Sequence, residues 1–326
     1  MRAVVIQEPG GPQVLALQEV PSPPLHAGQV RVQVKAVGLN RADLLQRKGL
    51  YPAPPGYPAH IPGLEFAGTI LELGPGVDDW ALGARVMGIT GGGAYADEVV
   101  VYGDSLMPVP PSWSWIQAAA FPEAYLTAFD ALRVQADLQL GQRLLIHAVG
   151  SGVGLAALQL AQYIGVTTYG TSRTPEKLAK AQRLGLHHGI LVQSGQFLEQ
   201  LRTLTQGQGV HVILDFIGAA YLQENVKALS TGGVLVVLGL MGGSQAPLPL
   251  EVVLSRRLTV RGSTLRARGR EDKALLVRRY MAELGDVLRG ETFLPIIDGV
   301  YPVESVQEAH QRLEQNESFG KLVLKF

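Results

Sequence analysis

The chain contains no cysteine among its 326 residues. This absence excludes disulfide bonds, thiolate catalysis, iron–sulfur clusters and every zinc site that uses thiolate ligands. It is also consistent with a reducing compartment, and we expect the protein to be cytoplasmic.

The chain also has no excess of either charge, because 28 lysines and arginines balance 28 aspartates and glutamates. A balanced chain lacks the global positive field that binding to nucleic acid or to an anionic membrane usually needs. No uninterrupted apolar run approaches the roughly 20 residues of a membrane span, and the apolar run in MRAVVIQEPGG is too short for a signal peptide core. We therefore expect neither nucleic acid nor a membrane as a partner.

Residues 1 to about 120 are interrupted often by glycine and proline, which predicts short strands. QVRVQVKAV (29–37) alternates between apolar and polar residues, as a half-buried strand does. Three further segments have the composition of strands between glycine turns: EFAGTILELG, ARVMGI and YADEVVVYG. This pattern is typical of a mostly antiparallel, barrel-like domain.

After the helical segment PEAYLTAF (122–129), strand-like segments alternate with helix-like ones. The strand candidates are RLLIHA, TTYGTS, GILV, VHVILDF, VLVVLGL and LTVRGST. Such alternation predicts a parallel sheet wound with helices on both faces. The tail holds a long helix, IIDGVYPV, another helix and KLVLKF, which we expect to return to the first domain. The sequence therefore predicts one domain from residues 1–121 and 267–326, and a second from residues 122–266.

A glycine-rich stretch, HAVGSGVGLAALQLAQ (147–162), lies between the first strand and the first helix of the alternating half. It does not match the dinucleotide fingerprint G-x-G-x-x-G, because only Gly154 keeps that register. The alternative to a cofactor loop is a tight turn followed by small residues that pack the helix. Its place after the first strand, where helix amides meet a pyrophosphate, favours the cofactor loop. The residues assigned to the cofactor are Gly150, Ser151, Gly152, Val153 and Gly154.

The end of the second strand indicates which cofactor binds. Domains that prefer NAD usually place an acid there to hold the ribose 2′-hydroxyl, but TTYGTSRTPEK has none before Glu176. Ser172, Arg173 and Lys177 are instead suited to a 2′-phosphate, which predicts NADPH. The alternative is that Arg173 and Lys177 are a solvated surface pair and that Ser172 or Thr174 caps the next helix.

Several segments together resemble a known family. They are GLNRAD (38–43), PEAYLTAF, SGVG (151–154), LDFIG, GLMGG and the final FGKLVL. With them the chain resembles the medium-chain dehydrogenase/reductase superfamily, in its zeta-crystallin-like quinone oxidoreductase branch, over essentially its whole length. The resemblance implies an α/β protein in which a Rossmann domain with a doubly wound parallel sheet joins a GroES-like, mostly antiparallel β-barrel domain.

The resemblance also implies which residues lie near the nicotinamide. Thr127 resembles the family residue beside that ring. The backbones of GLMGG and TLR, which follow two later strands, and of the FG pair in FGKLVL would line it; the alternative is that their glycines only form turns. The residues concerned are Leu240, Met241, Leu265, Arg266, Phe319 and Gly320.

A metal is not expected. Relatives with alcohol dehydrogenase activity hold zinc with a cysteine, a histidine in a G-H-E triplet, and a second cysteine or acid. Here Asn40 stands in the segment of the first cysteine, and Leu64 interrupts the corresponding triplet as GLE. The pair His187–His188 is interpreted as a solvated surface pair, and His147 as a buried histidine with a satisfied partner.

Without a metal, hydrogen-bond donors and positioning must act on the substrate. Asn40 is either such a donor or the N-cap of a helix over Arg41–Lys48, with Asp43 favouring the helix dipole; the two roles are compatible. Tyr51 opens the proline-rich loop YPAPPGYPAHIPG, which either walls a flat aromatic substrate or forms a rigid surface loop. We assign Asn40, Tyr51 and Thr127 to catalysis.

An alcohol or simple ketone needs strong polarisation, which zinc supplies, whereas a quinone is already electron-poor. We therefore expect NADPH-dependent hydride transfer to a quinone or another electron-poor carbonyl compound. One alternative is a double-bond reductase of enones or 2-alkenals. Another is a binding or structural role, since zeta-crystallin relatives are lens proteins and bind RNA. The apolar strand LTVRGST is expected at a sheet edge, and pairing there predicts a homodimer.

Overall fold

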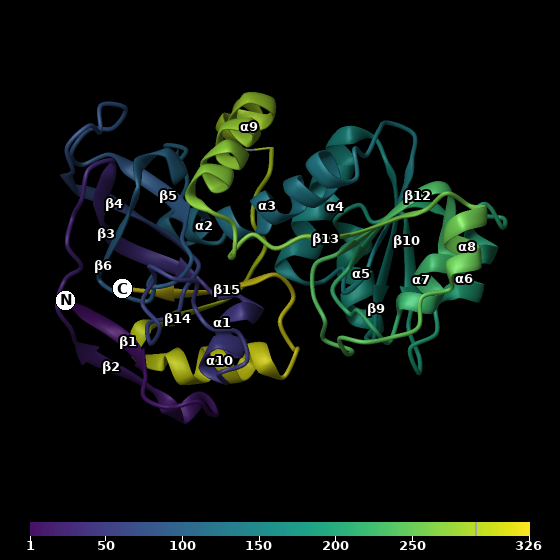
Figure 1. Ribbon diagram of the computed structural model, residues 1–326, viewed down its shortest axis with the longest axis horizontal. Coiled ribbons are helices and arrows are strands. Elements are labelled where there is room, and N and C mark those ends of the chain that lie inside the picture. The colour runs from purple at the N-terminus through teal and green to yellow at the C-terminus, as the bar shows by residue number, and fades with distance from the viewer. Residues whose placement is uncertain (291) are drawn as a thin grey trace. The chain divides into compact units, whose positions relative to one another are not determined.

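The computed structural model describes residues 1–290 and 292–326. The chain forms two compact units, shown in Figure 1. The first unit comprises Met1–Leu126 and Leu265–Phe326, and the second comprises Thr127–Thr264. None of the described helices is long and apolar enough to cross a membrane.

The first unit is built on a seven-stranded sheet in the order β14-β15-β3-β4-β5-β7, with β6 also paired to β3. Its strands are β3 Gln29–Gly38, β4 Glu65–Leu73, β5 Arg85–Ile89, β6 Glu98–Tyr102, β7 Leu106–Pro108, β14 Ile297–Pro302 and β15 Lys321–Lys325. Every pair is antiparallel except β14 with β15. The tail strands therefore return to the first part of the chain, as the sequence predicts. A separate hairpin joins β1 Arg2–Ile6 to β2 Leu15–Glu19.

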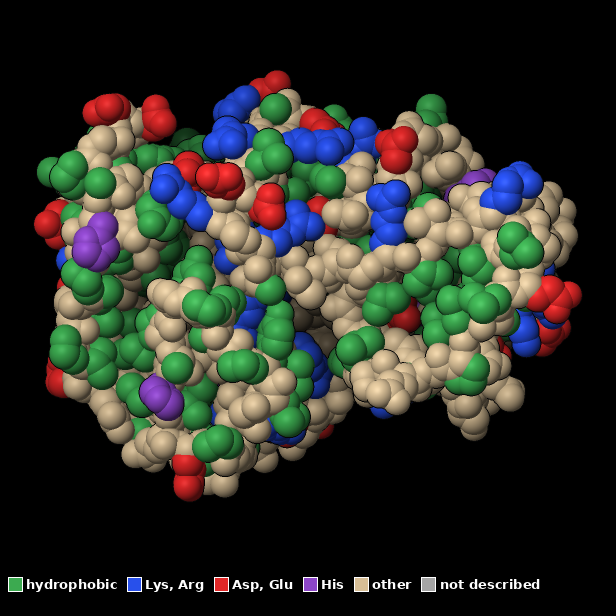
Figure 2. Space-filling view, viewed as in Figure 1, with side chains coloured by type: hydrophobic (Ala, Val, Ile, Leu, Met, Phe, Trp, Pro, Cys, Tyr) green, Lys and Arg blue, Asp and Glu red, His purple; other side chains and the backbone are tan. Residues whose placement is uncertain are grey.

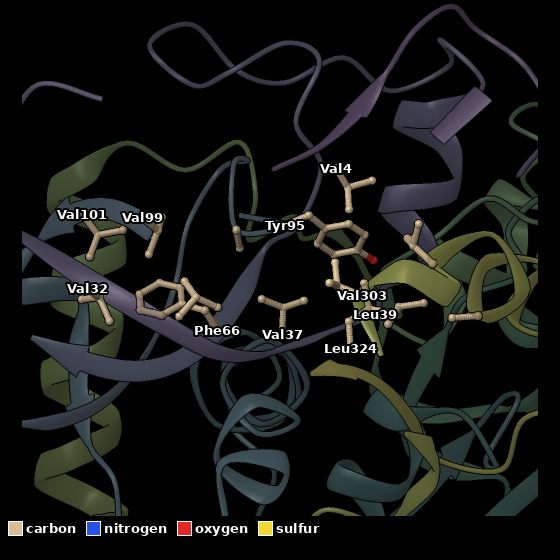
Figure 3. Close-up of a cluster of buried hydrophobic side chains, with 14 of the residues drawn as sticks. Val4, Val32, Val37, Leu39, Phe66, Tyr95, Val99, Val101, Val303 and Leu324 are labelled. Atoms are coloured by element: carbon tan, nitrogen blue, oxygen red, sulfur yellow. The ribbon is translucent and has the colours of Figure 1, made fainter. Parts of the chain in front are cut away.

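The alternation predicted for residues 29–37 appears as alternating burial along β3. Its buried side chains, with those of β4, β6 and β15, form the apolar core of this unit. Figure 3 shows the ring of Tyr95 among apolar neighbours that include Val4 and Val303. Because Tyr95 carries a hydroxyl into this core, that hydroxyl needs a polar partner.

The helices of this unit are α1 Arg41–Arg47, α2 Trp115–Ala119, α9 Arg270–Arg289 and α10 Val306–Glu314, with short turns η1 Pro12–Val14, η2 Gly103–Ser105 and η4 Val303–Ser305. Helix α3, Pro122–Phe129, runs across the boundary between the two units and continues into η3, a π-helix over Asp130–Gln135. The predicted helix over 41–48 is thus confirmed to within one residue.

The second unit is a six-stranded, wholly parallel sheet in the order β10-β9-β8-β11-β12-β13. Its strands are β8 Arg143–Ile146, β9 Thr167–Ser172, β10 His188–Leu191, β11 Val210–Asp215, β12 Leu229–Val237 and β13 Thr259–Gly262. Its helices are α4 Gly152–Ile164, α5 Pro175–Arg183, α6 Leu198–Leu204, α7 Leu222–Ala228 and α8 Leu250–Ser255. They flank the sheet in Figure 1. Counted along the chain from β8, this order is 3-2-1-4-5-6, that of a dinucleotide-binding doubly wound sheet.

Candidate functional site

The glycine-rich loop leaves β8 at the point where the strand order reverses, between β8 and its neighbour β11. Ser151 is the N-cap of the 13-residue helix α4, and its Oγ accepts a hydrogen bond from the Gly154 N–H at 3.1 Å. Ala148 holds the turn with φ of 46°, a left-handed conformation that few residues with a side chain adopt. The loop thus presents the amino end of α4 at the crevice where such sheets bind ligands.

At Gly154 the start of helix α4 lies close to the backbone that leaves strand β8. A Cβ atom added there would lie 2.7 Å from the Val149 carbonyl oxygen and 2.8 Å from that of Ala148. Only glycine therefore lets the helix start so near the strand. The other residues of the loop contribute backbone N–H groups at the amino end of α4, where the helix macrodipole favours an anion. This arrangement fits a dinucleotide pyrophosphate.

His147 is fully buried and has two partners, as the sequence predicts. Its Nδ1 lies 2.9 Å from Thr171 Oγ1 and its Nε2 lies 2.7 Å from Asn225 Oδ1. Burial lowers the pKa of His147 to about 4, so the ring is neutral. Asn225 in turn donates to Asp215 Oδ2 at 3.1 Å, and burial raises the pKa of Asp215 to about 6.

Asp215 is a residue that sequence reasoning missed, although it ends the buried strand VHVILD. Its Oδ1 accepts hydrogen bonds from the backbone N–H groups of Ile217 and Gly218. The side chains of Thr171, His147, Asn225 and Asp215 therefore form one network at the carboxyl ends of β9, β8 and β11. An acid at the end of an apolar strand was the signal that could have found it.

The residues predicted to hold a 2′-phosphate lie together at the end of β9 and the start of α5. Ser172 is the last residue of the strand, and its Oγ accepts from the Thr174 N–H at 3.1 Å. Thr174 occupies the N-cap position without a side-chain hydrogen bond to the helix. Arg173 is exposed, and Lys177 is half-buried in the first turn of α5. Two cations and a hydroxyl thus share one helix end.

Other residues assigned to the cofactor occupy loops of both units. After β12, Leu240 and Met241 are 55% and 50% exposed in a turn fixed by the hydrogen bond from the Gly242 N–H to the Ile217 carbonyl. In the first unit, Leu265 and Phe319 are buried. Gly320 has φ of 103°, and a Cβ there would lie 2.2 Å from the Ile296 carbonyl oxygen. Glycine is therefore required at this turn before β15.

Asn40 is the N-cap of α1, as one of its two expected roles predicts. Its backbone N–H donates to Asp43 Oδ2 at 2.8 Å. Asp43 is fully buried and also accepts from the Tyr95 hydroxyl and the Gly63 N–H. Burial raises the pKa of Asp43 to about 6, against the hydrogen bond from Asn40 and the charge of Lys321. Asp43 thus supplies the partner that the Tyr95 hydroxyl requires.

The side chain of Asn40 is turned toward a buried ion pair. Its Nδ2 donates to Glu65 Oε1 at 2.9 Å, and its Oδ1 accepts from Lys321 Nζ at 2.8 Å. Lys321 Nζ also lies 2.5 Å from Glu65 Oε1 and 2.8 Å from the Leu39 carbonyl oxygen. Sequence reasoning missed both ions, although each lies in a quoted motif, GLE or FGKLVL. These contacts fix the amide of Asn40 in one orientation.

Tyr51 is held by a buried arginine. The Arg266 guanidinium donates to the Tyr51 and Gly91 carbonyl oxygens, both at 2.9 Å, and to Gln46 Oε1 at 2.5 Å. It also lies 4.9 Å from the centroid of the Tyr51 ring. The side chain of Arg266 therefore anchors the proline-rich loop. The carbonyl of Arg266 accepts from Lys273 Nζ at 2.9 Å.

Both units of the chain match models of known protein families. Residues 26–111 match the model of the alcohol dehydrogenase GroES-like domain, and residues 152–279 match that of the zinc-binding dehydrogenases. A quinone oxidoreductase-like protein 2 homologue from Nematostella vectensis is 32% identical over 325 residues, covering 99% of this chain and 88% of its own. The chain belongs to the quinone oxidoreductase-like medium-chain dehydrogenases/reductases. It is therefore an oxidoreductase with a fold that binds a nicotinamide cofactor.

Several solved structures are similar to this chain over its whole length. A quinone oxidoreductase of Pseudomonas syringae pv. Tomato DC3000 has a TM-score of 0.90 and 28% identity, covering 100% of this chain and 99% of its own. Mycobacterial Rv1454c complexed with NADPH gives 0.88 and 28%, with full coverage of both chains. The JamJ enoyl reductase gives 0.88 and 26%, covering 99% and 98%. The structures similar to this chain therefore include both a quinone oxidoreductase and an enoyl reductase.

The name of the second family model raises the question of zinc. Among residues 1–290 and 292–326, no group of three or more histidine, cysteine, aspartate or glutamate side chains is arranged to hold a metal. Leu64 is 1% exposed and belongs to the apolar core. His187 is exposed, as predicted for the histidine pair, and its Nδ1 accepts from the Thr168 N–H, whereas His188 is half-buried and stacks on Tyr169.

Proposed function

We propose that this oxidoreductase uses NADPH to reduce quinones, or other electron-poor carbonyl compounds, by hydride transfer without a metal. The observation that carries the proposal is the loop at Ser151 and Gly154, which places the amino end of α4 at the switch point of the parallel sheet. When bound, NADPH would supply the hydride. The residues that would hold its pyrophosphate are Gly150, Ser151, Gly152, Val153 and Gly154.

Preference for NADPH is supported by the cationic end of β9. Ser172, Arg173 and Lys177 would hold the 2′-phosphate, because the strand ends without an acid that could accept from a ribose hydroxyl. The similar mycobacterial structure that contains NADPH agrees with this choice. The nicotinamide would be lined by Thr127, Leu240, Met241, Leu265, Arg266, Phe319 and Gly320.

The absence of thiolate ligands and the apolar Leu64 support an electron-poor substrate. Such a substrate accepts hydride without a Lewis acid, provided that it is positioned at near-attack distance. Tyr51, fixed by Arg266, offers an aromatic wall for a flat ring. Asn40 would contribute to catalysis from the amino end of α1, where hydrogen bonds with Glu65 and Lys321 orient its side chain.

One second candidate has a specific observation in its favour. The fold is as similar to the JamJ enoyl reductase as to NADPH-complexed Rv1454c, with TM-scores of 0.88 in both cases. The alternative reaction is NADPH-dependent reduction of the double bond of enones or 2-alkenals. NADPH consumption measured across quinones, enones and 2-alkenals, with identification of the products, separates the two. Turnover of alcohols or simple ketones, with none of these substrates reduced, would contradict both.

We also propose a cytoplasmic homodimer that forms through β13. This strand is at the edge of the six-stranded sheet, as the sequence predicts, and it carries Val260 with 41% exposure. Helix α8 directly precedes β13 in the chain and has no buried residue; its Leu250 and Leu254 are 69% and 81% exposed. Figure 2 shows hydrophobic side chains over the region where Figure 1 places α8. A second copy paired with this edge would cover that apolar surface.

A further inference from the structure

Glu123 lies in the first turn of α3, next to the buried ion pair of the first unit. Its backbone N–H donates to Glu65 Oε2 at 2.8 Å. Glu65 also accepts hydrogen bonds from the Asn40 amide and from the Lys321 ammonium, with which it forms the ion pair. The Glu123 carboxyl has no hydrogen-bond partner in the described part of the chain, and it retains partial exposure.

Charged and titratable groups from several elements surround the Glu123 carboxyl. Those that interact with it electrostatically are Asp43 of α1, Tyr51 of the proline-rich loop, Glu65 of β4, Arg266, Lys273 of α9 and Lys321 of β15. Burial, followed by the charge of Glu65, raises the pKa of Glu123 to about 8, whereas the two lysines oppose the shift. At neutral pH the carboxyl therefore carries a proton.

The proposed reduction of a quinone needs a proton as well as a hydride. A hydride added to a quinone leaves a hydroquinone anion, and the product forms only when an oxygen of that anion gains a proton. Such a donor acts best when its pKa lies near the working pH. Thr127, proposed beside the nicotinamide, follows Glu123 by four positions on α3, so their side chains emerge from one face of the helix.

We propose that the Glu123 carboxyl donates the proton that completes reduction of the substrate. The O–H bond of Glu123 breaks, a new O–H bond forms on the substrate oxygen that has gained negative charge, and the hydride comes from the reduced nicotinamide. The resulting Glu123 carboxylate recovers a proton from water after the product leaves. This inference rests on the proposed function, and it applies equally to an enone, whose reduction also consumes one hydride and one proton.

The neighbouring groups are less suited to this role. Burial raises the pKa of Tyr51, so its hydroxyl holds the proton more tightly. Lys273 Nζ is bound to the Arg266 carbonyl and lies over the Tyr57 ring at 5.0 Å from its centroid. Asp43 is fully buried and occupied by three donors. Glu123 alone in this group combines a proton at neutral pH with a carboxyl left unbonded by the described residues.

The first test is E123Q, which keeps the size and polarity of the side chain but removes its acidic proton. With a quinone that the wild type reduces, kcat should fall by about 10²- to 10⁴-fold, whereas NADPH affinity measured by fluorescence should stay unchanged. The wild-type kcat should decrease as the pH rises through about 8, and the residual rate of E123Q should not. The control E19Q makes the same change at an exposed glutamate of the same unit and should behave as wild type.

The second test does not depend on activity. Infrared difference spectra of the full chain, titrated across pH 8, should show a protonated carboxyl band that disappears as the pH rises. The band should persist in E19Q and be absent from E123Q, with circular dichroism showing that each variant is folded. If E123Q does not fold, E123D replaces it, with a shifted band and a lowered kcat expected.

Two outcomes separate the inference from the function on which it rests. If the wild type reduces no quinone, enone or 2-alkenal with NADPH, the proposed function is wrong and the inference is wrong with it. If the wild type is active and E123Q keeps its kcat and pH profile, or no carboxyl band titrates near pH 8, only the role of Glu123 is wrong.

Discussion

The Lys321 ammonium lies 2.5 Å from Glu65 Oε1, and the two side chains, 256 residues apart in the chain, are both buried. A buried ion pair gains little over an apolar pair of similar size, but removing one partner leaves an uncompensated charge. The pair therefore makes each ion dependent on the other.

Replacing Lys321 by methionine should destabilise the protein by about 3–5 kcal/mol, because Glu65 then loses its cation and is left with the hydrogen bonds from Asn40 and the Glu123 N–H. Urea unfolding followed by circular dichroism measures the change. Adding E65Q to K321M should recover much of the loss. The control K325M, at an exposed position of the same strand, should change the stability little. Equal effects of K321M and K325M would show that the pair is not buried in solution.

Catalysis should not depend on zinc. Cysteine is absent from the chain, and Leu64 is a buried apolar side chain, so strong chelators should leave the rate of quinone reduction unchanged. Elemental analysis of chelator-washed protein checks the metal content directly. Stoichiometric zinc, together with activity that is lost on its removal and restored on its return, would contradict the metal-free mechanism.

Selection of NADPH should depend on Arg173 and Lys177. A charge-assisted hydrogen bond contributes about 1.5–3 kcal/mol, so R173A or K177A should weaken NADPH binding roughly ten- to a hundredfold while leaving NADH almost unchanged. Fluorescence titration with both cofactors measures this difference. K180A, at an exposed lysine later in the same helix, is the matched control. A wild type that prefers NADH would refute the assignment.

The protein should be a dimer at micromolar concentration, as measured by light scattering, because β13 leaves a sheet edge and an apolar side chain exposed. V260K should place a charge on this edge and produce monomers. L275K changes a leucine of α9 that is 58% exposed and should leave the dimer intact. A monomeric wild type would rule out the interface.

The buried His147 should make the stability of the protein depend on pH on the acid side. Burial lowers its pKa in the folded protein from the ordinary value of 6.5 to about 4, so its contribution to stability is complete above pH 6.5 and is lost as the pH falls toward 4. H147Q should reduce the slope of unfolding free energy against pH in this range by up to one proton, or about 1.4 kcal/mol per pH unit. The exposed His26 provides the control H26Q. Identical slopes for H147Q and wild type would contradict a buried neutral ring.

The sequence predicts the elements whose evidence is local. The alternation in residues 29–37, the helix capped by Asn40 and the loop before α4 all depend on neighbours a few positions away, and each is observed. Strand order follows in part, because alternating strands and helices restrict the possible windings.

The polar contacts of the site could not be predicted in the same way. Glu65, Glu123 and Lys321 are each a single charged residue within an apolar motif, and their pairing arises only when β4, α3 and β15 pack together. The same is true of Arg266, whose acceptors Tyr51 and Gly91 are 215 and 175 residues away. Spacing along the chain carries no information on such contacts.

The position of β15 between β14 and β3 also constrains the order in which the chain can assemble. Every strand of the six-stranded parallel sheet precedes β15 in the chain, so the ribosome has synthesised all of that sheet before Lys321 is added. Domains commonly fold as units during synthesis. The second unit can therefore fold while Glu65 is still without its cation, and the seven-stranded sheet of the first unit is completed last.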